Sequence, residues 1–204
     1  MMSNEYSYEY EWDSRYCYPN SNILINKLGI TNADELHIAE REITALQLAV
    51  AQIETISGNF DLAHLKAIHH HLFSDIYEWA GEVRWVNISK GNFFCLYEFV
   101  EEHANSLFKK LKQENYLSNT TAEEIPARLA YYLSEINVLH PFREGNGRTQ
   151  RLFIEYLAFE AGYDVDFSNV GNKEMIEASA EAFSCDYSSM EEIFRRITTP
   201  LDDM

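Results

Sequence analysis

The sequence predicts an all-α fold, a helical bundle that carries one short β-hairpin. Apolar residues recur at three- and four-residue spacing over most of the 204 residues, which is the pattern of helices with one buried face. A single stretch in the middle of the chain alternates instead, as strands do. The length and a hydrophobic content of 46% suit one compact domain with one core.

Six segments carry the helical spacing. They cover residues 43–53, 62–76, 100–111, 125–136, 152–159 and 190–197. Thr121 to Glu124 form a plausible N-terminal capping signal for the fourth segment. Pro141 disfavours the helical conformation for the residue before it, so this fourth helix should stop near Leu139.

The alternating stretch, residues 82–96, predicts a β-hairpin. It is rich in β-branched and aromatic residues, and Lys90-Gly91-Asn92 supplies a glycine-containing turn. A two-stranded ribbon leaves an edge of unpaired backbone groups. That edge either packs as a connector, which is the simpler interpretation, or offers a rail on which an extended segment of another protein can pair.

The charge balance limits the class of partner. Asp and Glu number 33 against 16 Lys and Arg, a formal net charge of −17, and so acidic a surface repels nucleic acid and anionic lipid. The three cysteines lack metal-site spacing, and we find no signal peptide and no apolar run of membrane-spanning length. We therefore expect a cytoplasmic protein that binds neither nucleic acid directly nor a membrane.

Residues 140–151, HPFREGNGRTQR, gather cationic and flexible residues within this acidic background. His140 follows a predicted helix and precedes a proline, so we expect it to be extended at the negative end of that helix. The helix dipole there makes the imidazole a better proton acceptor. A histidine that merely caps helix carbonyls would occupy the same place, so its position alone does not separate the two roles.

Gly145, Asn146 and Gly147 precede residues with helical spacing, which favours a glycine-rich loop feeding a helix over a hairpin turn. Glycines let successive backbone N–H groups point into one concavity, and the helix dipole adds positive potential there. The ligand class that suits such a nest is phosphate.

Three charged residues surround that loop. Arg148 and Arg151 leave the same face of the first helical turn, where guanidinium forks can match phosphate oxygens. The alternative for each arginine is an internal acidic partner. Glu144 either holds Mg²⁺ beside phosphate oxygens or neutralises the neighbouring Arg143.

Every specified position of the motif HPFx[D/E]GNGRxxR is filled by residues 140–151, which therefore resemble the Fic (filamentation induced by cAMP) family. Residues 68–81 with Arg84 look like the helix before the family's flap, and residues 87–91 look like the flap hairpin. Tyr18-Pro19 and residues 23–30 resemble short bacterial Fic toxins that pair with a separate antitoxin. The resemblance leaves residues 1–15 as an N-terminal extension and 16–204 as the Fic domain.

This resemblance implies a Fic fold that transfers AMP from ATP to a hydroxyl side chain of a target protein. His140 would take the proton from that hydroxyl, and Glu144 would hold Mg²⁺ across the phosphates. The implied ATP ligands are Gly145, Asn146, Gly147, Arg148 and Arg151 in the loop and helix, and Ser89, Lys90 and Gly91 in the flap. Asn92 and Phe93 of the flap would register the target segment as an added strand.

The resemblance also implies a restraint on activity. Fic enzymes are commonly inhibited by a helix bearing [S/T]xxxE[G/N], whose glutamate pairs with the second motif arginine, here Arg151. Several Ser/Thr–Glu pairs of this chain have the spacing, but none is followed by Gly or Asn. We therefore expect a small antitoxin protein to supply the glutamate.

Other interpretations stay open. The chain could be a catalytically weak Fic scaffold that binds nucleotide and partner, although His140 and Glu144 are both intact. It could also transfer a different nucleotide, such as UMP. Type II topoisomerase, which some bacterial relatives of this short type modify, is the target to test first. The adjacent His69, His70 and His71 point in different directions on a helix, so we expect one packed and two exposed rings rather than a metal site.

Overall fold

The computed structural model describes residues 9–10, 15–90 and 92–201, and the predicted all-α fold with a small hairpin is confirmed within them. The helices in chain order are α1 (Ala33–Ile53), α2 (Leu62–Phe73), α3 (Val100–Gln113), α4 (Ile125–Leu139), α5 (Asn146–Glu160), α6 (Asn172–Ala182) and α7 (Ser188–Ile197). The strands are β1 (Glu9–Tyr10), β2 (Ile88–Lys90), β3 (Asn92–Phe93), β4 (Tyr163–Val165) and β5 (Thr198–Pro200). None of these helices is long and apolar enough to cross a membrane, within the ranges described.

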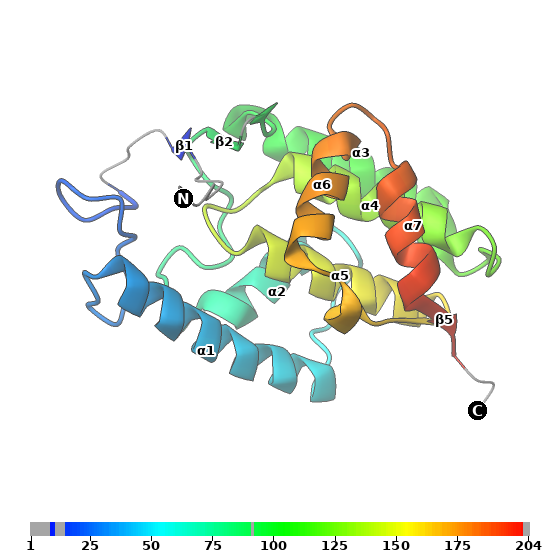
Figure 1. The fold of residues 1–204 in the computed structure, drawn as a ribbon, viewed down its shortest axis with the longest axis horizontal. Coiled ribbons are helices and arrows are strands. Elements are labelled where there is room, and N and C mark those ends of the chain that lie inside the picture. The colour runs from blue at the N-terminus through cyan, green and yellow to red at the C-terminus, as the bar shows by residue number, and fades with distance from the viewer. Residues whose placement is uncertain (1–8, 11–14, 91, 202–204) are drawn as a thin grey trace.

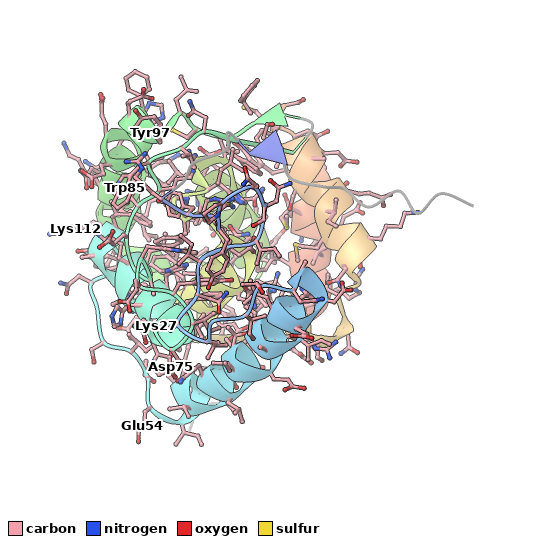
Figure 2. All side chains as sticks on the ribbon, turned by 90° about the vertical axis from the view of Figure 1, so that its left-hand side faces the viewer. Lys27, Glu54, Asp75, Trp85, Tyr97 and Lys112 are labelled. Atoms are coloured by element: carbon pink, nitrogen blue, oxygen red, sulfur yellow. The ribbon has the colours of Figure 1, made fainter. Side chains whose placement is uncertain are left out.

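Helix α5 lies in the middle of the molecule, between α2 and α4, while α7 packs along α4 (Figure 1). The apolar residues Leu152, Phe153 and Leu157 of α5 are buried, because they face these neighbouring helices. Side chains fill the interior, and Glu54 and Lys112 lie at the surface (Figure 2). This packing fixes the first turn of α5 and the loop before it, where the motif lies.

Helix α1 ends at Ile53 as the spacing predicts but begins at Ala33, well before residue 43, and most of the apolar residues that predict it do not mark its buried face. Leu46, Val50 and Ile53 are 70%, 43% and 85% exposed. The buried positions are Leu36, Glu40, Thr44 and Ala51. The inner face is partly polar because Glu40 and Thr44 accept hydrogen bonds from other parts of the fold.

The predicted hairpin is present as β2 and β3, with Lys90 opposite Asn92; Gly91 between them lies outside the described residues. The short strand β1 pairs with β2 and places Tyr10 opposite Ile88. The flap is therefore a three-stranded sheet in the order β1-β2-β3, not a two-stranded ribbon. Among the described strands, β3 is an outer strand of this sheet, and Phe93 on it is 72% exposed.

Candidate active site

His140 does not have the extended conformation expected from the proline that follows it. Helix α4 ends at Leu139 as predicted, but His140 closes the helix with φ 44° and ψ 58°, in the left-handed region. Its N–H still donates to the carbonyl of Ile136, at 3.1 Å. The expectation was wrong because helices often end in a left-handed residue that keeps such a bond, and tertiary contacts can hold a non-glycine residue there.

Arg84 supplies those contacts. Its side chain is buried, and its Nε donates to the His140 carbonyl at 2.7 Å. The same guanidinium donates to the carbonyls of Val86, Cys95 and Leu139. Burial lowers the pKa of Arg84 to about 10, so the group keeps its charge at neutral pH. One buried cation therefore joins the base of the flap to the end of α4.

The imidazole of His140 has a defined environment. The ring of Phe94 stacks on it with centroids 3.7 Å apart, and the residue is only 4% exposed. Its Nδ1 lies 3.3 Å from the carbonyl of Asn137. A carbonyl only accepts, so in the neutral ring Nδ1 carries the proton and Nε2 carries the lone pair. The ring is thus set up to accept a proton at Nε2.

The loop between α4 and α5 is shaped by Asn146 and Gly145. The Asn146 side chain accepts from the N–H of Phe142 at 2.9 Å and donates to the Phe142 carbonyl at 2.8 Å. This amide therefore closes the loop, and a bound anion would meet the backbone of Asn146 instead. Gly145 has φ 81°, and a Cβ there would lie 2.2 Å from Cζ of Phe73, so the fold requires glycine.

Gly147 is not required by the fold in the same way. It lies in the first turn of α5, and a Cβ there would have Arg151 Nη1 as its nearest neighbour, at 3.4 Å. The first N–H groups of a helix have no partner within that helix. Those of Gly147 and Arg148 have no acceptor among the residues that the structure describes. The space above Gly147 is therefore a cradle of free donors that a side chain would fill, which suits an anion.

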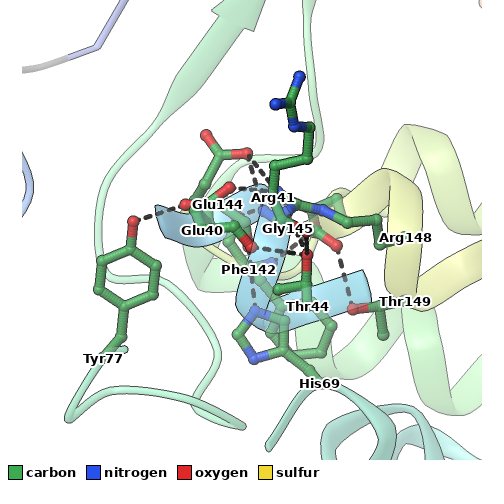
Figure 3. Close-up of polar contacts among 11 residues, drawn as sticks. Glu40, Arg41, Thr44, His69, Tyr77, Phe142, Glu144, Gly145, Arg148 and Thr149 are labelled. Atoms are coloured by element: carbon green, nitrogen blue, oxygen red, sulfur yellow. Dashed lines mark hydrogen bonds and ion pairs between the residues drawn. The ribbon is translucent and has the colours of Figure 1, made fainter. Parts of the chain in front are cut away.

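The two motif arginines have different surroundings. Arg148 donates to a carboxylate oxygen of Glu40 and, through Nη1, to the Thr44 hydroxyl at 3.0 Å, so the internal acidic partner left open by the sequence exists for this arginine (Figure 3). Its guanidinium also lies 4.8 Å from the centroid of the Phe73 ring. The Arg151 side chain makes no hydrogen bond or close ion pair with a residue in the described ranges. Burial and the nearby Arg148 both lower the pKa of Arg151, and the charge that most raises it is that of Glu155, one turn further along α5.

Glu144 is fixed through its own backbone and its neighbour. Its Oε1 accepts from the N–H of Gly145 at 2.9 Å, and its carbonyl lies 3.0 Å from Nε2 of His69. Burial, and then the negative charge of Glu40, raise the pKa of Glu144, while the cation of Arg148 opposes them. A cation beside Glu144 would relieve this repulsion. One carboxylate with nucleotide phosphates and waters is a donor set that Mg²⁺ accepts.

His69 is the one packed ring expected among the three adjacent histidines, and it supports the site in a role that the sequence did not identify. It is fully buried between aromatic rings, and burial lowers its pKa to about 3, so it stays neutral. Because the N–H of Gly81 donates to its Nδ1 at 2.8 Å, its Nε2–H donates to the Glu144 carbonyl. Of the other two histidines, His70 is exposed as expected, but His71 is half-buried with its Nε2 3.0 Å from the Gln47 carbonyl.

The flap residues named from the sequence lie on both strands of the hairpin. Ser89 is buried in the middle of β2, and Lys90 is paired with Asn92 in the register of the hairpin. The N–H of Phe94 donates to the Ile88 carbonyl at 3.2 Å, and the Phe94 ring stacks on His140. The flap is therefore in direct contact with the predicted base.

The fold and this site define a helical protein with unpaired N–H donors at a helix N-terminus, among the described residues, beside a buried histidine. The family model described as Fic/DOC family matches residues 59–158. The chain is 39% identical to a probable protein adenylyltransferase Fic of Salmonella typhimurium, covering 89% of this chain and 90% of that protein. It is 39% identical to the probable protein adenylyltransferase y4lH of Sinorhizobium fredii, over 89% and 94% of the two chains. The chain belongs to the Fic/DOC family.

Longer relatives and solved structures agree with this assignment. Protein adenylyltransferase VbhT of Bartonella schoenbuchensis is 41% identical over 90% of this chain, which spans only 39% of the length of VbhT. The crystal structure of BepC from Bartonella tribocorum with bound AMPPNP has a TM-score of 0.87 and 29% identity, and covers 93% of this chain and 99% of that one. An N-terminal Fic domain from Bartonella quintana with bound ADP has a TM-score of 0.88 and 33% identity, over 93% and 97% of the two chains.

Proposed function

We propose that this protein transfers AMP from ATP to a hydroxyl side chain of another protein. Two features of one site carry the proposal: the imidazole of His140 can accept a proton at Nε2, and the N–H groups at the start of α5 have no acceptor among the described residues. The relatives named protein adenylyltransferase, and the nucleotides bound by the two Bartonella Fic structures, support the same activity.

The chemistry assigns one role to each group. Nε2 of His140 takes the proton of the target hydroxyl while the hydroxyl oxygen attacks the α-phosphorus of ATP. The bond between the α-phosphorus and the oxygen that bridges the α- and β-phosphates breaks. Pyrophosphate leaves, and its charge is met by Arg148, Arg151 and the N–H groups of the first turn of α5. Mg²⁺, held by Glu144, would neutralise phosphate charge.

Arg151 is the group through which we propose regulation. It is a partly buried cation with no ion-pair partner among the described residues, so a glutamate from a small antitoxin bearing [S/T]xxxE[G/N] would satisfy it. The bound carboxylate would exclude the γ-phosphate. Adding such a co-encoded protein should suppress AMP transfer, and its Glu→Ala variant should not. Equal suppression by both would contradict this mode of inhibition.

The flap is the proposed docking site for the target. Phe93 on the outer strand β3 is exposed, and an extended target segment can pair along such a strand. Asn92 belongs to the same strand, while Ser89, Lys90 and Gly91 remain the proposed flap contacts to nucleotide. A type II topoisomerase in the cytoplasm is the first target to test.

Incubation of the protein with α-labelled ATP and a bacterial lysate tests the function. We expect labelled target protein that disappears in His140→Ala and persists in His70→Ala, because His70 is an exposed histidine of α2. Labelling that ignores His140 would refute the assignment. Labelling from UTP instead of ATP would favour UMP transfer, and nucleotide binding without any labelling would favour the weak scaffold.

A further inference from the structure

Helix α1 brings a carboxylate to the first motif arginine. The Glu40 side chain is 10% exposed, and one of its oxygens accepts from Nη2 of Arg148. The other oxygen accepts from the hydroxyl of Tyr77 at 2.6 Å (Figure 3). Three distant parts of the chain, α1, the segment after α2 and the start of α5, therefore meet at one buried carboxylate.

A buried carboxylate is costly unless both oxygens have partners, so Glu40 is held in one position by Tyr77 as well as by Arg148. Tyr77 is 1% exposed, and burial, followed by the charge of Glu40, raises its pKa. Its hydroxyl thus remains protonated and donates at any physiological pH. Glu40 cannot turn away from Arg148 without leaving the Tyr77 hydroxyl unpaired.

The contact orients Arg148 without exhausting it. A guanidinium has five N–H donors in a fixed plane. One is used by Glu40 and one by the Thr44 hydroxyl, and the latter also donates to the Glu40 carbonyl at 2.7 Å. The ring of Phe73 lies against the same guanidinium. The remaining donors keep one direction, because α1 and Phe73 hold the rest of the group.

We propose that Glu40 is a positioning residue, which holds Arg148 through a buried ion pair so that its remaining donors meet the β- and γ-phosphates of the nucleotide. This inference rests on the proposed function, since it assumes that ATP is the ligand. The opposite interpretation of the same contact is an internal lock, in which Glu40 competes with phosphate for Arg148. The two interpretations predict effects of opposite sign.

The test compares ATP with AMP, which lacks the phosphates assigned to Arg148. In Glu40→Gln we expect the Kd of Mg·ATP, measured by calorimetry, to rise about tenfold or more, because one charge-assisted bond orients the arginine. The Kd of AMP should stay within about twofold. Tyr77→Phe, which frees one oxygen of Glu40, should change ATP affinity in the same direction by less. Glu42→Gln is the matched control, because Glu42 lies exposed on the same helix and loses the same charge.

Equal loss of ATP and AMP affinity in Glu40→Gln would show a merely structural role, and unchanged or tighter ATP binding would overturn positioning in favour of a lock. If Glu40→Gln does not fold, Tyr77→Phe decides by the same comparison. The proposed function fails separately, when the parent protein binds ATP but shows no His140-dependent labelling.

Discussion

Replacing Gly147 with alanine separates the needs of the fold from the needs of the site. The added methyl group would have its nearest neighbour at 3.4 Å, the flexible end of Arg151, so the folded chain can accept it. Alanine is better than glycine in a helix by about 0.5–1 kcal/mol. In a domain of this size each kcal/mol moves the Tm by about 2–4 °C. We therefore expect a Tm that is unchanged or up to about 4 °C higher.

The same methyl group would occupy the cradle above the first turn of α5. Phosphate would then lose one bond to a backbone N–H group, and a bond to a charged partner contributes about 1.5–3 kcal/mol. Calorimetry should show Mg·ATP binding weakened by about tenfold to a hundredfold. Gly145→Ala is the contrast: its φ of 81° and the 2.2 Å approach to Phe73 predict a lower Tm. Parental ATP affinity in Gly147→Ala, or a Tm several degrees lower, would refute the assignment of the cradle.

Three other expectations concern stability, the flap and pH. Burial raises the pKa of Glu155 to about 7, so the folded chain holds a proton that the unfolded chain releases near pH 4.5. This one group should therefore lower the unfolding free energy by about 2 kcal/mol between pH 5 and 8. Urea titrations of Glu155→Gln should lack this pH-dependent loss, while the exposed control Glu160→Gln should keep it. Arg84→Lys should lower the unfolding free energy by about 2–4 kcal/mol, since an ammonium cannot serve four carbonyls; Arg195→Lys at the surface should change it by less than about 0.5 kcal/mol, and equal effects would contradict this. Phe93→Ala should reduce labelling of the target but leave the Kd of ATP unchanged, and a parental labelling rate would exclude docking on β3.

The local parts of the molecule follow from the sequence. The end of α4 at Leu139 is predicted by Pro141. The Thr121 hydroxyl donates to the Glu124 carboxylate at 2.8 Å just before α4, but the N-cap residue is Glu124 and makes no side-chain capping bond, so the capping signal marks the start of the helix without capping it. Helix α6 escapes prediction because the positions that it buries, Ala178 and Ala182, are small and give little apolar contrast. Strands β4 and β5 have three residues each, too few for a periodic signal.

Part of the site likewise follows from the sequence, and part of it depends on the fold. The loop and both arginines are contiguous in sequence, so the motif reveals them together. Glu40 is 108 residues from Arg148, and one carboxylate among several on helix α1 gives no sign of that partner. Only the packing of α1 against α5 brings them together. The left-handed His140 likewise depends on Arg84, which is 56 residues away.

The buried Arg84 also fixes the distance between the flap and the His140 ring. One guanidinium donates to the carbonyls of Val86 and Cys95, which flank the hairpin strands β2 and β3, and to the carbonyl of His140. The hairpin and the imidazole of His140 therefore cannot shift independently. An extended peptide laid along β3 would present alternate side chains on opposite sides. Only a hydroxyl at one position along the peptide, and on the side of it that faces His140, would then come within reach of the ring. The position of a residue along the peptide, rather than its chemistry, would therefore select which hydroxyl is modified.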